Sequence, residues 1–248
     1  MHELPGQSRA YYWINMTTIK LDPIGTIRSP YKEKFAVPRQ PGLVSRARAQ
    51  LEMLPPYNDP SAFRGLGEFS HLWLVFVFHQ TMEQGWKPTV RPPRLGGNER
   101  VGVFSTRSTF RPNPIGLSVV ELRDMCKDGS RVWLELGGVD LVDGTPIVDI
   151  KPYIPWADAV PHAHGGFAPA PPDLGMEVIF SPEAEQACAR STIPELKEFI
   201  TEVLVQDPRP AYKKQLQQWQ QYGVRLYDYN VRYEVFGQLT RVLELERL

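Results

Sequence analysis

Residues 104–122 read FSTRSTFRPNPIGLSVVEL, a polar loop that runs directly into an apolar segment. Arg111 and Asn113 each precede a proline, which restricts both residues to extended backbone. Each proline also has a fixed φ, so we expect a stiff loop at the mouth of a strand over 117–122. A guanidinium and a carboxamide held in this way suit recognition of a planar polar ligand or a phosphate, although a basic surface loop without a ligand has the same pattern.

Short strands are predicted on both sides of this loop. The segment 47–54 alternates between apolar and polar residues, and the run HLWLVFVFH at 71–79 is so apolar that it predicts a central strand covered on both faces. The remaining strands are predicted at 21–29, 101–104, 117–122, 131–136 and 146–154. Short strands separated by turn residues predict an antiparallel β-barrel or sandwich domain over residues 21–158.

The character of the chain changes after this domain. Residues 159–175 are rich in Pro, Ala, Gly and His without periodicity, which is typical of a linker. Residues 176–248 predict a smaller C-terminal α+β domain. Its expected elements are a strand at 176–180, a helix from Pro182 to about 190 capped by Ser181, a helix to about 205 opened by a Thr192/Glu195 capping box, a helix or turn at 212–219, and three strands between 224 and 246.

Composition limits the classes of function. Lys plus Arg and Asp plus Glu each number 28 in 248 residues, so any nucleic-acid contact must come from a local basic patch. Two cysteines, Cys126 and Cys188, without a ligand pattern fit a reducing compartment, and we expect a cytoplasmic protein. We find no membrane span and no secretory signal, and we treat residues 1–20 as an N-terminal extension in which Met16 could be the natural start.

Several common catalytic signatures are missing. The chain has no Gly-x-Gly-x-x-Gly dinucleotide loop, no Gly-Lys-Ser/Thr phosphate loop and no Gly-x-Ser-x-Gly nucleophile elbow. His162 and His164 form a His-x-His pair, but no third ligand is spaced to match, so we predict no metal site. A hydrolase would need a nucleophile–base pair that the sequence does not offer.

Polar residues gather in the loops between the predicted strands. They include Arg39 and Gln40 between two prolines, His79 and Gln80 after the apolar strand, and Asp140, Asp143 and Asp149 around another loop. Loops at one end of a small barrel can converge on one pocket. Ordinary turn chemistry explains the acidic loop equally well, and a capped strand end explains His79.

The segment YGVRLYDYNVRY at 222–233 interleaves arginines with tyrosines. Arg225, Arg232 and Tyr229 belong to this segment, and such a pattern can stack and clamp single-stranded bases. Cross-strand aromatic contacts within an ordinary strand pair give the same pattern, so both interpretations stay open.

Several motifs in order now identify a family. FSTRSTFRPNPIGLS, followed by GVDLVDGTPIVDIKPYIPWAD and preceded by PIGTIRSPY and VPRQPG, resembles the TrmO family over about residues 22–158. The pieces DPRPAY and YGVRLYDYNVRY are similar to the second domain of its longer bacterial members. Thr109 departs from the pattern, because a proline is usual there.

The resemblance implies a homodimeric single-sheet β-barrel enzyme. Its reaction would transfer a methyl group from S-adenosyl-L-methionine to the N6 of threonylcarbamoyl-adenosine beside the tRNA anticodon. The cofactor pocket would be lined by Pro38, Arg39, Gln40, His79, Gln80, Arg107, Leu117, Asp140, Leu141, Val142 and Asp143. The acceptor side would comprise Arg111, Asn113, Asp149, Lys151 and Tyr153, while Arg225, Arg232 and Tyr229 would contact RNA.

The reaction assigns tasks to these residues. Carboxylates such as Asp140 and Asp143 would offset the sulfonium charge and hold the methionyl ammonium, and Arg111 would grip the threonyl carboxylate. Asp149 or a water would accept the amine proton. The alternative is a non-catalytic RNA-binding β-barrel module that uses no cofactor.

Overall fold

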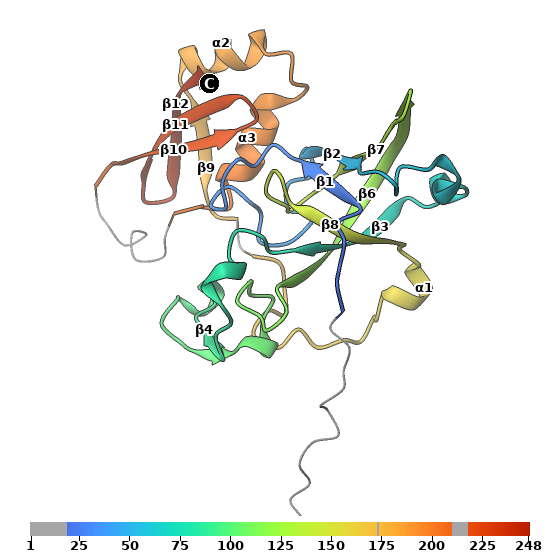
Figure 1. The fold of residues 1–248 in the computed structure, drawn as a ribbon. Helices are drawn as coiled ribbons and strands as arrows, with labels where there is room; N and C mark the ends of the chain where they lie inside the picture. Colours follow the sequence, from blue (N-terminus) through green and yellow to red (C-terminus); the bar gives the residue numbers. More distant parts are fainter. Residues whose placement is uncertain (1–18, 173, 210–217) are drawn as a thin grey trace, which may run out of the picture.

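Within the residues that the structure describes, 19–172, 174–209 and 218–248, six strands close into a barrel and four form a second sheet (Figure 1). The structure is a computed structural model. The strands are β1 Gly25–Arg28, β2 Arg48–Met53, β3 His71–Val77, β4 Thr89–Val90, β5 Val101–Gly102, β6 Ile115–Asp128, β7 Arg131–Gly137, β8 Pro146–Pro152, β9 Glu177–Phe180, β10 Gln220–Leu226, β11 Tyr229–Phe236 and β12 Leu239–Arg247. The α-helices are α1 Pro155–Asp158, α2 Pro182–Arg190 and α3 Leu196–Leu204, and short 3-10 helices are η1 Pro60–Phe63, η2 Leu66–Glu68, η3 Met82–Gln84, η4 Pro93–Leu95 and η5 Val103–Ser105.

The barrel follows the order β1-β2-β7-β6-β3-β8, and β8 returns to β1. All its neighbouring strands are antiparallel. Strand β6 makes closure possible because residues 115–121 pair with β3, whereas residues 121–128 pair with β7 beyond an irregularity between Leu122 and Asp124. The predicted choice between a barrel and a sandwich is therefore resolved as a closed barrel.

Alternation along the strands separates the inside of the barrel from its outside. Leu72, Leu74 and Phe76 of β3 are buried, while the intervening Trp73 and Val75 are only half-buried. The prediction that this strand is covered on both faces is wrong for the described chain. An unbroken apolar run shows that both faces of the strand are apolar, but it does not predict that one face remains partly exposed to solvent.

Two other local predictions differ from the structure. The strand expected at 101–104 ends at Gly102 and turns into η5, which brings the following loop round toward the barrel mouth. The capping box at Thr192 and Glu195 does not form, because α3 begins at Leu196 with Glu195 as its N-cap in left-handed backbone at φ 52°. In contrast, Ser181 caps α2 as predicted, since its side chain accepts a hydrogen bond from the Ala184 N–H.

The second sheet has the order β10-β11-β12-β9, in which only the pairing of β12 with β9 is parallel within the described chain. Helix α3 buries one face, made of Leu196, Phe199, Ile200, Val203 and Leu204. Most of the helix or turn expected at 212–219 lies outside the described residues. No helix in the described part of the chain is both long and apolar enough to span a membrane.

The barrel and the second sheet share buried contacts. Tyr31, fully buried, lies 6.0 Å from the Phe199 ring, and Tyr227 lies 5.2 Å from Phe199 on the other side, both measured between ring centroids. The Tyr227 N–H donates to the Pro30 carbonyl over 2.8 Å. Arg46 pairs with Glu202 of α3 at 2.5 Å. The segment after β1 is therefore held by the C-terminal half as well as by the barrel.

Candidate functional site

A pocket of about 450 Å³ opens where four loops meet at one end of the barrel. The loops precede β2, follow β3, precede β6 and follow β7. Its lining combines apolar rings with cations and a single carboxylate from the described chain. It is lined by Lys34, Val37, Pro38, Arg39, Gln40, Phe76, Phe78, Thr106, Arg107, Thr109, Arg111, Ile115, Gly116, Leu117 and Asp140.

Two proline-containing loops are joined directly across this pocket. A guanidinium nitrogen of Arg107, Nη1, donates to Gln40 Oε1 over 2.5 Å, although the two residues are 67 positions apart. The Gln40 loop is anchored next to this contact, because the Gly42 N–H donates to the Gly138 carbonyl over 2.8 Å. Since a charge-assisted hydrogen bond has a preferred geometry, it fixes the two loops relative to each other.

One wall of the pocket is aromatic. Phe76 and Phe78 lie edge to face with ring centroids 5.1 Å apart, and Phe76 pairs in register with Gly116 of β6. A Cβ at Gly116 would lie 2.3 Å from the Phe76 ring and 2.8 Å from the Phe78 ring. The glycine therefore lets both rings lie against the strand backbone. The predicted site lacked these residues, because an isolated glycine in a strand indicates a close approach to the backbone but does not identify the side chains that make it.

Asp140 is the carboxylate of the pocket. Ser118, buried inside the barrel on β6, donates its hydroxyl hydrogen bond to Asp140 Oδ1. Burial raises the pKa of Asp140 to about 6. The hydrogen bond from the Ser118 hydroxyl, the backbone N–H of Asp140 itself and the charge of Arg107 lower this pKa in part. A partly desolvated carboxylate in such a place favours a ligand that carries positive charge.

The other charges of the pocket are positive. Lys34, Arg39, Arg107 and Arg111 line it together with Asp140. No carboxylate of the described chain lies within ion-pair distance of Lys34 or Arg39. Such a surplus of cations attracts an anionic ligand. The pocket thus offers one group for a cation, several for an anion and flat rings for an apolar or aromatic body.

Arg111 stabilises the loop that carries it. Its Nη1 donates to the carbonyls of Thr106 at 2.8 Å and Val103 at 3.3 Å, and its guanidinium carbon lies 5.7 Å from the centre of the Phe104 ring. The Asn113 side chain is exposed outside the pocket lining. Of the two candidate side chains of this loop, Arg111 lines the pocket and Asn113 does not.

The acidic loop after β7 divides into two parts. Asp143 accepts from the Ser29 N–H at 2.9 Å and pairs with Lys32 at 2.9 Å, and the carbonyl of the buried Leu141 accepts from the Ser29 hydroxyl at 2.7 Å. The Val142 carbonyl accepts from the Thr145 hydroxyl at 2.7 Å. These three predicted residues tie the loop to the barrel and lie outside the pocket lining.

His79 and Gln80 continue the chain just after the aromatic wall. Neither lines the pocket. The His79 N–H donates to the Val77 carbonyl over 2.8 Å, so the strand ends in a tight turn. This turn positions Phe78, whose N–H donates to the Pro114 carbonyl over 2.8 Å and joins the end of β3 to the Arg-Pro-Asn-Pro loop.

Asp149, Lys151 and Tyr153 lie on the outer face of the barrel. Asp149 is opposite Val75, which is opposite Leu117 at the pocket edge, so these residues form one row across β8, β3 and β6. Two strand spacings separate Asp149 from Leu117, which is about 10 Å. Lys151 pairs with Asp149 at 2.6 Å, and the Tyr153 ring packs 5.9 Å from Trp73 between centroids.

The arginines of the C-terminal sheet have acidic partners. Arg232 contacts Glu244 at 2.6 Å and Glu246 at 3.5 Å, and Arg225 lies 3.7 Å from Glu33. The Tyr229 hydroxyl hydrogen-bonds the Ser191 hydroxyl at 3.3 Å. The register of β10 and β11 also places Tyr222 opposite Tyr233, with ring centroids 5.5 Å apart and nearly stacked. The cross-strand interpretation of this segment therefore describes the observed contacts.

No group of three or more His, Cys, Asp or Glu side chains within the described ranges is arranged to hold a metal ion. His162 and His164 are exposed in the segment before β9.

Comparison with known families divides the chain into two matched stretches. A family model described as the tRNA-methyltransferase O N-terminal domain matches residues 26–159, and one described as the TrmO C-terminal domain matches residues 173–248. The first stretch contains the barrel and its pocket, and the second contains the C-terminal sheet.

Two bacterial relatives are similar to this chain over nearly their whole length. The chain is 55% identical to a tRNA (adenine(37)-N6)-methyltransferase of Escherichia coli, over 93% of this chain and 99% of that one. It is 48% identical to a putative S-adenosylmethionine-dependent methyltransferase RcsF of Pseudomonas aeruginosa, over 92% and 98%. A crystal structure of TrmO from Pseudomonas aeruginosa superposes with a TM-score of 0.74 at 41% identity, over 93% of this chain and 99% of that one.

Proposed function

This chain belongs to the TrmO family, and on that premise we propose that it methylates the N6 of threonylcarbamoyl-adenosine beside the tRNA anticodon. The methyl donor is S-adenosyl-L-methionine. The single observation that carries this function is 55% identity to a tRNA (adenine(37)-N6)-methyltransferase over almost the full length of both chains.

The pocket has the chemistry that this donor requires. S-adenosylmethionine supplies an electrophilic methyl group on a sulfonium, together with an ammonium, a carboxylate and a flat adenine. Asp140 is the pocket's carboxylate for the positive groups, and the Phe76 and Phe78 rings, which lie over Gly116, give the pocket an apolar wall for the adenine. Arg39 and Arg107 are cations for the carboxylate. The residues present therefore fit the group.

We assign the donor side of the site to Pro38, Arg39, Gln40, Arg107, Leu117 and Asp140, which share the pocket. His79 and Gln80 support it from the turn after β3. The segment Leu141, Val142 and Asp143 supports it from the opposite side, because its hydrogen bonds hold the Asp140 backbone beside Ser29. Since these last residues do not line the pocket, their proposed task is to position others.

Methyl transfer demands alignment more than it demands a reactive side chain. The task of this chain is to hold the acceptor amine in line with the donor and to keep water out. Arg111 is our candidate for the threonyl carboxylate of the base, because it is a guanidinium at the pocket rim. The amine must also lose a proton, and we propose that Asp149 accepts it. We place Lys151, Tyr153 and Asn113 near the base that receives the methyl group.

We propose a homodimer as the working unit. The outer faces of β3 and β6 carry Ile115, Leu117 and Val119 opposite Val77, Val75 and Trp73, an apolar stripe in which Leu117 is 54% exposed. Exposed apolar stripes of this kind often mark an interface. The stripe adjoins both the pocket edge and Asp149, so an interface there would bring the outer-face residues close to a site. Light scattering during size-exclusion chromatography measures the mass and tests this proposal.

We place the protein in the cytoplasm because its proposed substrate is tRNA. Arg225, Arg232 and Tyr229 stay a proposed contact for the anticodon arm. The two arginines would have to exchange their glutamate partners for phosphate, which lowers the net gain from such a contact.

The decisive experiment mixes the protein with methyl-labelled donor and either threonylcarbamoylated or unmodified tRNA, followed by digestion to nucleosides. We expect label in N6-methylated threonylcarbamoyl-adenosine only with the modified tRNA. Binding of tRNA without transfer, and without donor binding by calorimetry, would contradict the proposal and favour a non-catalytic RNA-binding barrel.

A further inference from the structure

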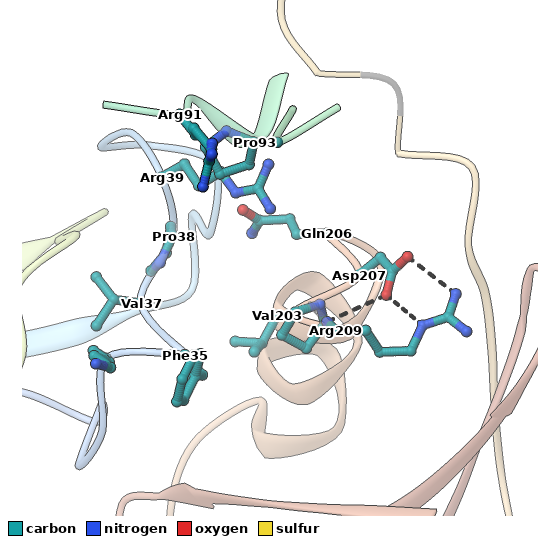
Figure 2. A pocket seen from close by; sticks show the side chains of 14 residues that line it. Phe35, Val37, Pro38, Arg39, Arg91, Pro93, Val203, Gln206, Asp207 and Arg209 are labelled. Carbon is teal, nitrogen blue, oxygen red and sulfur yellow. Dashed lines mark hydrogen bonds and ion pairs between the residues drawn. The ribbon is translucent and has the colours of Figure 1, made fainter. Parts of the chain in front are cut away.

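A second hollow of about 310 Å³, drawn in Figure 2, is lined in part by the same chain segment as the pocket. We call it the basic hollow. It is formed by the 34–39 segment, the region around η4 and the end of α3. It is lined by Lys34, Phe35, Ala36, Val37, Pro38, Arg39, Arg91, Pro93, Gly97, Val203, Gln206, Asp207, Pro208 and Arg209. It therefore joins the barrel loops to the C-terminal half.

Three cations of the basic hollow are uncompensated. Lys34, Arg39 and Arg91 have no carboxylate within ion-pair distance anywhere in the described chain. The fourth cation, Arg209, is different, because it is buried and bound to Asp207 at 2.7 Å and 3.0 Å. With that pair cancelled, the hollow carries a net charge of about +3.

These cations can act together on one ligand. Figure 2 shows Arg39 and Arg91 close to Gln206 at one side of the hollow, with Phe35 at the other. Phe35 is 61% exposed, and Lys34 Nζ lies 5.2 Å from the centre of its ring. Guanidinium groups beside an exposed aromatic ring suit a nucleotide, which has a phosphate and a flat base.

The basic hollow and the pocket have a common wall. Lys34, Val37, Pro38 and Arg39 line both of them. A ligand that continued from the pocket over this wall would meet cations in both places, which favours a chain with repeating anionic groups. Consecutive phosphates of a single strand meet this condition, whereas a small molecule confined to the pocket does not.

We propose that the basic hollow binds the RNA backbone next to the methylated adenosine, with Arg91 on a phosphate and Phe35 against the adjoining base. This inference rests on the proposed function and adds to it the route of the strand. The route uses cations without partners, unlike Arg225 and Arg232 of the C-terminal sheet, which are already paired.

The test substitutes Arg91, which is exposed. This residue lines the basic hollow but not the pocket. Arg91→Ala is expected to weaken binding of threonylcarbamoylated tRNA about 3- to 10-fold near 0.1 M salt, and to reduce the slope of log affinity against log salt by about 0.7. Donor affinity by calorimetry and turnover at saturating tRNA are expected to stay at the wild-type values.

Arg91→Lys and Arg64→Ala are the matched controls. Arg91→Lys keeps the charge, so it should retain the salt slope while losing part of the affinity. Arg64 is an exposed arginine at the end of η1 that lines neither the pocket nor the basic hollow, and Arg64→Ala should change neither quantity. Melting temperatures of all variants verify that they are folded.

Three results would overturn the inference. They are unchanged tRNA affinity in Arg91→Ala, an equal loss in Arg64→Ala, or a loss of donor affinity in place of tRNA affinity. The first result would leave the hollow to a ligand other than RNA. These results differ from failure of the proposed function, because that failure is an absence of methylated nucleoside with the wild-type protein.

Discussion

Lowering the pH from 7 to 5 should weaken binding of S-adenosylmethionine about tenfold through Asp140. In the free protein, burial raises the pKa of this carboxyl to about 6 from its ordinary value of 3.8. Above pH 6 the carboxylate is charged and attracts the positive groups of the donor. Below pH 6 it is neutral, and that attraction is lost.

The magnitude follows from the ionised fraction of Asp140. With a pKa of about 6, that fraction is about 0.9 at pH 7 and about 0.1 at pH 5. If only the charged form binds the donor well, the apparent dissociation constant rises by the ratio of these fractions, which is about ten. Ser118 supports the charged form through its hydrogen bond, so Ser118→Ala should move the midpoint upward.

Calorimetric titration with two ligands at pH 5, 6 and 7 measures this effect. S-adenosylhomocysteine lacks the sulfonium charge but keeps the ammonium. A pH effect on S-adenosylmethionine alone would place Asp140 beside the sulfonium, and an effect on both ligands would place it beside the ammonium. Asp140→Asn should bind weakly with no pH dependence from this group, and Ser118→Thr, which retains a hydroxyl, should keep a midpoint closer to the wild-type one than Ser118→Ala does.

Protonation of Asp140 does not unfold the chain at low pH, so the predicted loss of donor affinity cannot be a loss of stability caused by this residue. The raised pKa means that the folded chain holds this proton more tightly than the unfolded chain does. The contribution of Asp140 to the free energy of unfolding is therefore fully present below about pH 3.8 and is lost as the pH rises through about 6. Affinity and this part of stability change in opposite directions. A flat pH profile for both ligands, or an unaltered profile in Asp140→Asn, would refute the reasoning.

Three further changes test other parts of the structure. Arg111→Ala should reduce methylation of threonylcarbamoylated tRNA far more than it reduces donor affinity, and equal losses in activity and calorimetry would contradict the proposed role. Gly116→Val should push the Phe76 ring from its place, lowering donor affinity and destabilising the fold by about 1–3 kcal/mol in urea titrations, whereas wild-type values for both would show that the ring is not held there. Phe199→Ala should cost about 3–5 kcal/mol because it leaves a cavity beside Tyr31, and the wild-type protein should melt in one calorimetric transition, so two separated transitions would disprove a shared core.

Much of this arrangement could be predicted from local sequence. The prolines around Arg39 and Arg111 indicate stiff loops. Gly129 lies in the hairpin turn before β7 with positive φ, and Ser181 caps α2 with its side chain. These signals act over a few residues. The meeting of Arg107 with Gln40 depends on the register of six strands instead, so the sequence could only suggest that their loops converge.

The aromatic wall of the pocket was beyond local reasoning for the same physical cause. Phe76 belongs to a run in which every residue is apolar, and nothing within the run separates a ring inside the barrel from one at its mouth. Only the pairing of β3 with β6 sets Phe76 opposite Gly116, where the missing side chain leaves room for the ring. Asp143 and Asp140 illustrate the converse. The two carboxylates are three residues apart in one loop. Asp143 binds the Ser29 N–H and Lys32, whereas Asp140 lines the pocket.

Charge gives the clearest case of what register decides. Arg232 lies among tyrosines in the sequence, which favours an RNA platform, but the pairing of β11 with β12 places it opposite Glu244 and within reach of Glu246. Arg91 is not part of such an aromatic pattern in the sequence, yet it lines the basic hollow and has no carboxylate within ion-pair distance among the described residues. A phosphate gains most from the cation whose charge is not already used. An RNA contact in this protein should therefore be sought first where the fold leaves arginines unpaired, and the salt dependence of Arg91→Ala against that of Arg232→Ala measures which surface the strand follows.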